Sequence, residues 1–229
     1  EYQLYPSLHP LKGFHDLLCL VDHKVIWEWI QKYTPTVSDY LSNFRPQLSG
    51  IWYADETVLK FRGKTHWHWD AIDEGTRFIV GNHLSANRSF QNGKTFFENC
   101  GHNKPRPQSI TTDNLPTYPR AINSEFFSRY SHRRVKHNQI NHVKENILIE
   151  RWHGTLKDRT RVMRGLKSPE TEIINGFVIH YNFLREHGSL KGKTPAQMSQ
   201  IELPFEDGWG DLIQWSTHWQ TLCQTENPT

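Results

Sequence analysis

One acidic residue lies where an ionised side chain needs a partner. Asp55 belongs to the run Ile51–Phe61, in which β-branched and aromatic residues alternate and apolar side chains fall on both faces, a pattern that predicts a central strand. A carboxylate in such a strand is costly unless a cation, a partner or solvent at the rim of the sheet compensates its charge. Asp55 is therefore either a metal ligand or the ion-pair partner of a base near the following turn. The candidate bases are Lys60, Arg62 and Lys64.

Two further acids, Asp113 and Glu150, are candidates for the same metal site. Asp113 follows the short strand predicted from the run SITTDN, at the kind of edge where α/β sheets place their ligands. The alternative is a turn or capping Asp, because Asp-Asn before Leu-Pro is ordinary loop chemistry. Glu150 lies on an amphipathic helix predicted over 144–166, about 100° round from the apolar stripe that would pack on the core. The stripe consists of Ile149, Trp152, Leu156 and Met163.

A row of cations follows Glu150 on the same predicted helix. Lys157 and Arg164 come at successive steps of seven residues and Arg161 lies close to them, which suits a phosphate backbone running along the helix. The alternative is a solvated face with helix salt bridges. Against it, Gly154 stands four residues after Glu150, where a paired base is expected.

Charge is unevenly distributed along the chain. Residues 117–167 contain twelve Lys or Arg and four acids, whereas residues 168–229 contain three and eight. A basic block in the middle of a folded chain suggests a surface for a polyanion, and the alternative is a solvated face.

The N-terminal region is typical of a partial helix-turn-helix. The run 22–33 has apolar residues at the spacing of one helix face, with Asp22 as N-cap, and a shorter helix is predicted over 14–21. Two helices joined by a tight turn are how helix-turn-helix DNA readers are built, although any two packed helices give the same pattern. Lys24 and Lys32 would then lie on or near the outward face, where they could contact DNA.

The remaining elements suggest an α/β core. Antiparallel strands are predicted over 51–61, 65–73 and 77–84, followed by a helix over 89–100 and the short strand before Asp113. The predicted divisions are a partial helix-turn-helix (1–35), a linker (36–50), a core (51–200) and a C-terminal helical tail (201–229).

Composition favours a soluble cytosolic protein with reduced thiols. No apolar run approaches the roughly 20 residues that cross a bilayer, and no charged-then-apolar leader precedes the first turn. The three cysteines lack a CxxC pairing, which argues against a disulfide framework and a cysteine-based zinc site. His66 and His68 share one face of the second predicted strand, and they are either zinc ligands in want of a third partner or solvated residues.

Several of these runs together resemble one known family. YADET (53–57), ITTDN (110–114) and NILIERWHGTLKDRTRVMRGLKS (146–168) are similar to the core of the DDE transposases of bacterial and archaeal insertion sequences, in the branch that forms cointegrates. YNFLREHGSLKGKTPAQM (181–198) resembles the closing helix and loop of that core. The resemblance implies an RNase-H-like, integrase-core fold, with a five-stranded mixed sheet flanked by helices. It also implies an N-terminal helix-turn-helix that recognises the ends of the element.

The resemblance also implies a set of catalytic residues. Asp55, Asp113 and Glu150 match the three family acids, with 36 residues between the last two, and Lys157 matches the basic residue seven after the Glu. We expect the acids to hold two Mg²⁺ ions, or Mn²⁺, with Asp55 bridging them. Glu56 and Asp73 are expected to be structural, because alternation turns Glu56 away from Asp55 and Asp73 falls in a turn.

The expected activity is strand cleavage and strand transfer in DNA transposition. The partners would be the ends of the element, target DNA and at least one further copy of the chain, because two ends must be handled together. The setting would be the prokaryotic cytoplasm, close to the nucleoid. Two alternatives stay open, a catalytically silent or repurposed DNA-binding remnant and a divalent-metal nuclease that cannot join strands. The tail after Ile201 matches no known pattern, and we expect it to pack on the core or to form a dimer contact.

Overall fold

The structure is a computed structural model that describes residues 22–140, 146–163, 166–205 and 208–226. These residues fall into two units. One unit is Ser42–Glu202, and the other joins the described residues up to Leu41 with those from Leu203 onwards. All three predicted catalytic acids belong to the first unit.

Strand β1 (Ile51–Phe61) has the bounds predicted from its alternating pattern and lies in the middle of the sheet. It pairs antiparallel with β2 (Lys64–Asp73) through a tight turn at Arg62 and Gly63. Both turn residues have positive φ, 47° and 81°, as the two-residue turn that matches the twist of the strands requires. The register of this hairpin is therefore set at its turn.

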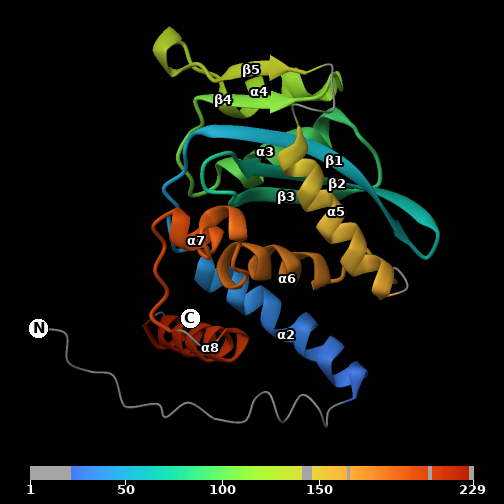
Figure 1. Ribbon diagram of the computed structural model, residues 1–229, viewed down its shortest axis with the longest axis vertical. Helices are drawn as coiled ribbons and strands as arrows, with labels where there is room; N and C mark the ends of the chain where they lie inside the picture. Colours follow the sequence, from blue (N-terminus) through green and yellow to red (C-terminus); the bar gives the residue numbers. More distant parts are fainter. Residues whose placement is uncertain (1–21, 141–145, 164–165, 206–207, 227–229) are drawn as a thin grey trace, which may run out of the picture. The chain divides into compact units, whose positions relative to one another are not determined.

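In the described part of the chain, five strands form one mixed sheet in the order β3-β2-β1-β4-β5 (Figure 1). Strand β3 (Ile79–Ser85) is antiparallel to β2. Strand β4 (Ser109–Thr112) is parallel to β1, and β5 (Lys136–Gln139) is parallel to β4. The sheet confirms the predicted RNase-H-like fold class.

Helices α3 (Phe90–Gly101) and α4 (Thr117–Phe126) cover one face of the sheet (Figure 1). Their aromatic residues, among them Tyr118, form a buried cluster with Trp52 of β1 and Trp69 of β2. Because these large side chains are fully buried, this face provides much of the hydrophobic stabilisation of the first unit.

Helix α5 (Ile147–Val162) crosses the other face of the sheet (Figure 1). Trp152 and Leu156 of α5 are buried against strand residues that include Leu59, which confirms most of the predicted apolar stripe. The prediction that Met163 is the last member of this stripe is wrong, because α5 ends at Val162 and Met163 is 42% exposed.

A glycine permits the close approach of β3 to α3. A Cβ atom built on Gly81 would lie 2.8 Å from Sγ of Cys100, a separation that real Cβ atoms do not show. Any larger residue at position 81 must therefore push the strand and the helix apart.

Short helical segments complete the first unit, and one of them is fixed to β3. The side chain of Asn182 accepts a hydrogen bond from the backbone N–H of Ile79 (2.8 Å) and donates one to its carbonyl oxygen (3.0 Å). The segments are the 3-10 turn η1 (Ser131–Arg133), α6 (Ile173–Ile179), the π-helical turn η3 (His180–Leu184), the 3-10 turn η4 (Gly188–Leu190) and α7 (Pro195–Met198).

The second unit contains a longer helix than predicted. Helix α2 (His23–Leu41) runs through Pro35, so the predicted helix end near residue 33 is wrong. A proline inside a helix costs about 3 kcal/mol, but Val37 and Tyr40 continue the buried face beyond it. The first predicted helix, over 14–21, lies outside the described residues.

Helix α8 (Trp209–Glu226) accounts for most of the predicted tail. It packs on α2, where the rings of Tyr40 and Trp219 lie 5.9 Å apart. The tail therefore contributes to the same unit as the N-terminal helix.

Among the described residues, none of the helices combines the length and the apolar character that crossing a membrane demands.

Candidate active site and metal centre

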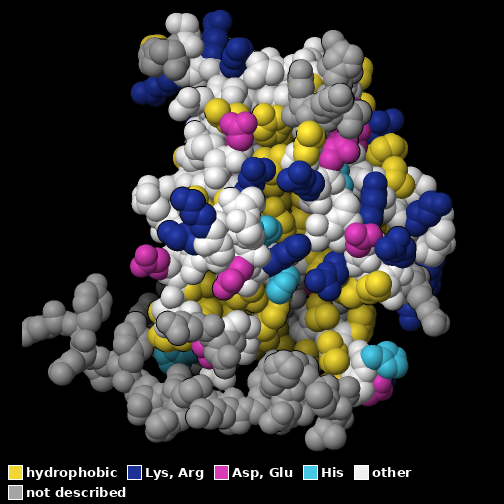
Figure 2. Space-filling view, viewed as in Figure 1, with side chains coloured by type: hydrophobic (Ala, Val, Ile, Leu, Met, Phe, Trp, Pro, Cys, Tyr) yellow, Lys and Arg dark blue, Asp and Glu magenta, His cyan; other side chains and the backbone are white. Residues whose placement is uncertain are grey.

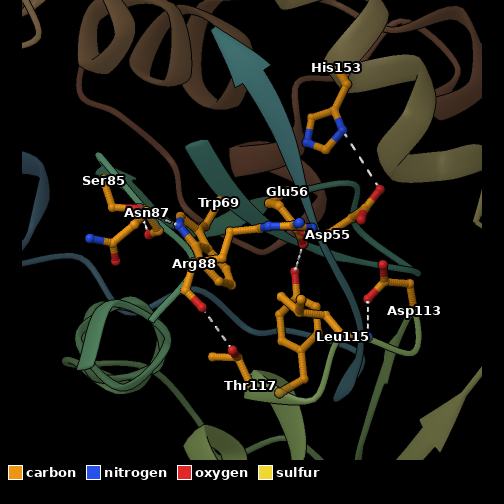
Figure 3. A network of polar contacts seen from close by, with 11 residues as sticks. Asp55, Glu56, Trp69, Ser85, Asn87, Arg88, Asp113, Leu115, Thr117 and His153 are labelled. Atoms are coloured by element: carbon orange, nitrogen blue, oxygen red, sulfur yellow. Dashed lines mark hydrogen bonds and ion pairs between the residues drawn. The ribbon is translucent and has the colours of Figure 1, made fainter. Parts of the chain in front are cut away.

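Asp55 and Asp113 are brought together by the parallel pairing of β1 with β4. Tyr53 of β1 lies beside Thr111 of β4, so Asp55, two residues further along β1, comes level with Asp113, the first residue after β4. One carboxylate oxygen from each of Asp55, Asp113 and Glu56 lies within 4.8 Å of the other two, and Figure 3 shows the three residues together. Strand pairing alone therefore gathers acids that are 58 positions apart in the sequence.

The loop after β4 orients Asp113. One of its carboxylate oxygens accepts a hydrogen bond from the backbone N–H of Leu115 at 2.9 Å, a side-chain turn typical of Asp at the start of a loop (Figure 3). The turn chemistry that sequence analysis treated as an alternative is thus present together with the acidic cluster, and it fixes the direction of this side chain.

Glu56 belongs to the acidic cluster, but its oxygens have other partners. One oxygen accepts the hydroxyl of Tyr118 at 2.6 Å, and the other pairs with Arg88 at 3.0 Å. Tyr118 lies on α4, so Glu56 leans towards the face opposite α5, as strand alternation predicts. Its carboxylate nevertheless lies close to Asp55, which alternation did not indicate.

Asp73, the other acid expected to be structural, closes a turn. It accepts hydrogen bonds from Ser49, Gly50 and Thr76, at distances between 2.9 and 3.2 Å. It is fully buried at the end of β2, and these donors compensate its charge.

Glu150 is exposed in the first turn of α5 and is not a member of the acidic cluster. The α5 residue that reaches Asp55 is His153, whose Nδ1 lies 3.9 Å from a carboxylate oxygen of Asp55 (Figure 3). Since Glu150 precedes His153 by three residues, it occupies the adjacent turn of the same helix. The structure thus gathers two of the three predicted ligands, and the role of Glu150 stays a prediction.

The predicted phosphate-binding residues lie in two places. Lys157 and Arg161 are exposed on α5, where Arg161 pairs with Asp158 at 3.2 Å. Figure 2 shows Lys and Arg side chains gathered over the face that carries α5. Lys24 and Lys32 are exposed on α2. The side chain of Arg164 lies outside the described residues.

The electrostatics of the cluster favour a cation. The pKa of Asp55 is raised from an ordinary 3.8 to about 7: burial is the largest cause, the charges of Glu56 and Asp113 also raise it, and the nearby His153 partly counteracts them. Carboxylates held this close repel one another unless a proton or a metal ion intervenes. The ligand set consists of oxygens, which Mg²⁺ and Mn²⁺ prefer, so these residues fit a hard divalent cation.

Two buried residues beside Asp55, Asp70 and His153, were not predicted as functional from the sequence, and His68 was considered only as a zinc ligand or a solvated residue. Asp70 of β2 lies directly opposite Asp55 in the β1–β2 register and is fully buried. Nε2 of His153 lies 3.2 Å from one oxygen of Asp70, and Nε2 of His68 lies 3.1 Å from the other. Burial would raise the pKa of Asp70, but the charges of the two imidazoles and the hydrogen bond of His153 hold it below its ordinary range.

The signal for part of this cluster was present in the sequence. His68 and Asp70 are two residues apart on a predicted strand, so they share one face. The prediction that His68 is a solvated residue, one of the two alternatives for it, is wrong, because its side chain is 1% exposed. The contact with His153 has no local signature, because 83 positions separate it from Asp70.

Comparison with known proteins gives the same family as the motifs around Asp55, Asp113 and Glu150. Residues 49–187, more than half of the chain, match the DDE domain model of IS240-type transposases. Transposases of Staphylococcus aureus are 26% identical over 98 residues, which is 42% of this chain and 43% of theirs. They include the transposase for the insertion sequence-like element IS431mec of strain Mu50 and the transposase for the element IS257 in transposon Tn4003. The chain thus spans less than half the length of these relatives.

Two solved structures have a similar fold. The HTLV-2 integrase catalytic core domain, solved in complex with magnesium in a dimeric form, is 20% identical with a TM-score of 0.52. The match covers 68% of this chain and 98% of that one. A chain of the simian T-cell lymphotropic virus intasome is 17% identical with a TM-score of 0.55, over 72% of this chain and 60% of that one. Both likenesses confirm the predicted integrase-core fold.

Proposed function

The chain belongs to the DDE transposases of insertion sequences, and from this premise we propose that it cleaves DNA strands and joins them to new sites. The observation that carries the proposal is the meeting of Asp55, within the central strand β1, and Asp113, just after the carboxyl end of the parallel strand β4. That edge of an α/β sheet is where ligands are usually bound. The fold could support other chemistry, but the runs that contain these two acids resemble the motifs of the family.

Asp55, Asp113 and Glu150 would hold divalent cations, two Mg²⁺ ions or Mn²⁺ in their place. When bound, such ions stabilise the charge that builds on the entering and leaving oxygens of a displacement at phosphorus. Asp113 is oriented for this role by its hydrogen bond from Leu115. The magnesium in the HTLV-2 integrase core supports the same class of ion here. Glu56 is a poorer ligand, because Tyr118 and Arg88 occupy its oxygens.

The reaction would proceed in two displacements. In the first, water attacks a phosphodiester at the end of the element, and the 3′ oxygen leaves as a hydroxyl. In the second, that 3′ hydroxyl attacks a phosphodiester of the target, forms the new strand joint and releases a 3′ hydroxyl on the target strand. Each step makes one P–O bond and breaks one, so no oxidant or energy carrier is required.

DNA would be bound by the cations of α5 and α2. Lys157, Arg161 and Arg164 would contact phosphates along α5, close to the acids. Lys24 and Lys32 would contact DNA from α2, as part of a region that recognises the ends of the element. We further propose that at least two copies of the chain act together, because two ends must be cut and joined in one event.

The test uses the full chain with pre-cut 3′ ends of its element and a supercoiled plasmid as target. Joined products are expected with Mg²⁺ or Mn²⁺. Asp55→Asn, Asp113→Asn and Glu150→Gln should each abolish joining while DNA binding stays nearly intact. Asp158→Asn is the matched control, because Asp158 is an exposed acid on the same helix as Glu150.

The alternatives give different outcomes in the same assay. A silent DNA-binding remnant would bind the ends without nicking or joining them. A metal-dependent nuclease would nick the plasmid and leave the supplied 3′ ends unjoined. Joining by either Asp variant at the wild-type rate would remove the assigned acids from the mechanism.

A further inference from the structure

A buried acid lies directly across the hairpin from the proposed metal ligand. Asp55 and Asp70 are partners in the β1–β2 register, and directly opposed residues of an antiparallel pair share one face of the sheet. Two like charges in this arrangement destabilise the sheet unless something separates them. Asp70 is fully buried, so solvent does not screen it.

His153 lies between these two carboxylates. One ring nitrogen, Nε2, is 3.2 Å from Asp70, and the other, Nδ1, is 3.9 Å from Asp55. The ring is 7% exposed and enters from α5, so a single side chain connects that helix to both strands of the hairpin. Figure 3 shows the ring above Asp55, on the side of the sheet that carries α5.

His68 completes the support of Asp70 from its other side. Its Nε2 is 3.1 Å from the Asp70 oxygen that His153 does not contact, and its ring is almost fully buried. Asp70 is therefore held between two imidazoles, one from its own strand and one from α5. A buried carboxylate without such partners would be strongly unfavourable. The arrangement fixes the direction in which Asp70 presents its charge to His153.

We infer that His153 is a positioning residue of the proposed metal site, and that Asp70 and His68 anchor it there. This inference rests on the proposed function. The anchored ring holds the Asp55 carboxylate in place beside Asp113 and fixes the rotation of α5, whose preceding turn carries Glu150. Residues that orient metal ligands without touching the metal typically change metal affinity 10- to 100-fold when they are altered.

The substitution His153→Gln separates positioning from a merely structural role. The amide nitrogen of the introduced glutamine can reach the place of Nε2 and donate to Asp70, but the side chain has no group in the place of Nδ1, next to Asp55. The variant should therefore fold with a melting temperature close to that of the wild type. Its affinity for Mn²⁺, measured on the full chain by electron paramagnetic resonance, should fall at least about tenfold.

Asp70→Asn tests the anchor through a double-mutant cycle. The isosteric change removes the charge that holds His153 and should also weaken Mn²⁺ binding about tenfold. The double variant should bind Mn²⁺ no more weakly than His153→Gln alone, because both changes act through the same ring. His66→Gln is the matched control, because His66 is a partly exposed histidine on the same strand.

The outcomes separate this inference from the proposed function. Wild-type Mn²⁺ affinity in a well-folded His153→Gln would overturn the positioning role, whether or not the chain joins DNA. Fully additive losses in the double variant would overturn the anchoring by Asp70. A wild-type chain that binds Mn²⁺ but joins no ends would remove the transposase activity. In that case, a weakened His153→Gln still supports the role of His153 at the metal site.

Discussion

Replacing Asp55 by Asn should stabilise the metal-free protein at neutral and alkaline pH. Burial and the neighbouring acids raise the pKa of Asp55 from 3.8 to about 7, although His153 counteracts them. Folding therefore favours the protonated form of Asp55. An ionised Asp55 destabilises the fold, and this penalty grows as the pH rises from about 4 to about 7 and then levels off. Asn has nearly the same shape and cannot ionise, so it avoids the penalty.

The magnitude follows from the size of this pKa change. One pKa unit corresponds to about 1.4 kcal/mol, so a rise from 3.8 to about 7 sets an upper limit of roughly 4 kcal/mol. The Asp55 side chain is 18% exposed, and solvent reduces the effect. We expect a gain of about 2 kcal/mol at pH 8, or roughly 4 to 8 °C in melting temperature for a chain of this size.

The assay is thermal unfolding in EDTA at pH 8 and at pH 4.5, for wild type, Asp55→Asn and the exposed control Asp158→Asn. The gain of Asp55→Asn should be clear at pH 8 and small at pH 4.5, whereas the control should change little at either pH. Added Mg²⁺ should stabilise the wild type more than Asp55→Asn, because the metal replaces the proton on Asp55. Equal gains at both pH values, or a loss of stability at pH 8, would refute the electrostatic reasoning.

Two further predictions concern the DNA-binding surface and the packing of the sheet. Lys157→Ala should weaken DNA binding and reduce the slope of log affinity against log salt by about one, measured by fluorescence anisotropy; an unchanged slope would remove Lys157 from the phosphate contacts. Gly81→Val should lower the free energy of unfolding by about 1 to 3 kcal/mol, because its Cβ would collide with Cys100. A melting temperature equal to that of the wild type would contradict this description of the β3–α3 contact.

The central hairpin was predictable because its signals are local. The run Ile51–Phe61 alternates along its whole length, and the bounds of β1 match it. Gly63 and the residues around it predicted the turn into β2. By contrast, β5 (Lys136–Gln139) is an edge strand with the sequence KHNQ, which shows no apolar alternation. Its position depends on pairing with β4, a contact that local pattern does not reveal.

The extent of α2 was underestimated for a related reason. Pro35 is a strong local signal for a helix end, and the prediction followed it. The helix continues because residues on both sides of Pro35 share one buried face that packs on α8. Tertiary packing outweighed the local preference of one residue.

The candidate site was partly predictable. Asp55 lies on a recognisable strand and Asp113 directly follows another, and the β1–β4 register brings them together. The ring of His153 and its anchor on Asp70 were not predictable, because their contact depends on how α5 crosses the sheet. From the sequence, the helix was predicted to have an apolar stripe that packs on the core and a charged face towards solvent. His153 is a buried polar residue, so it belongs to neither face.

The most direct test of the account is the location of bound Mn²⁺, determined by anomalous diffraction from crystals of the full chain grown with that ion. Mn²⁺ should be bound by Asp55, Asp113 and Glu150, with metal–oxygen distances of about 2.1 Å and with His153 still in contact with Asp70. Mn²⁺ bound by Glu56 in place of Glu150, or found away from Asp55 and Asp113, would contradict it.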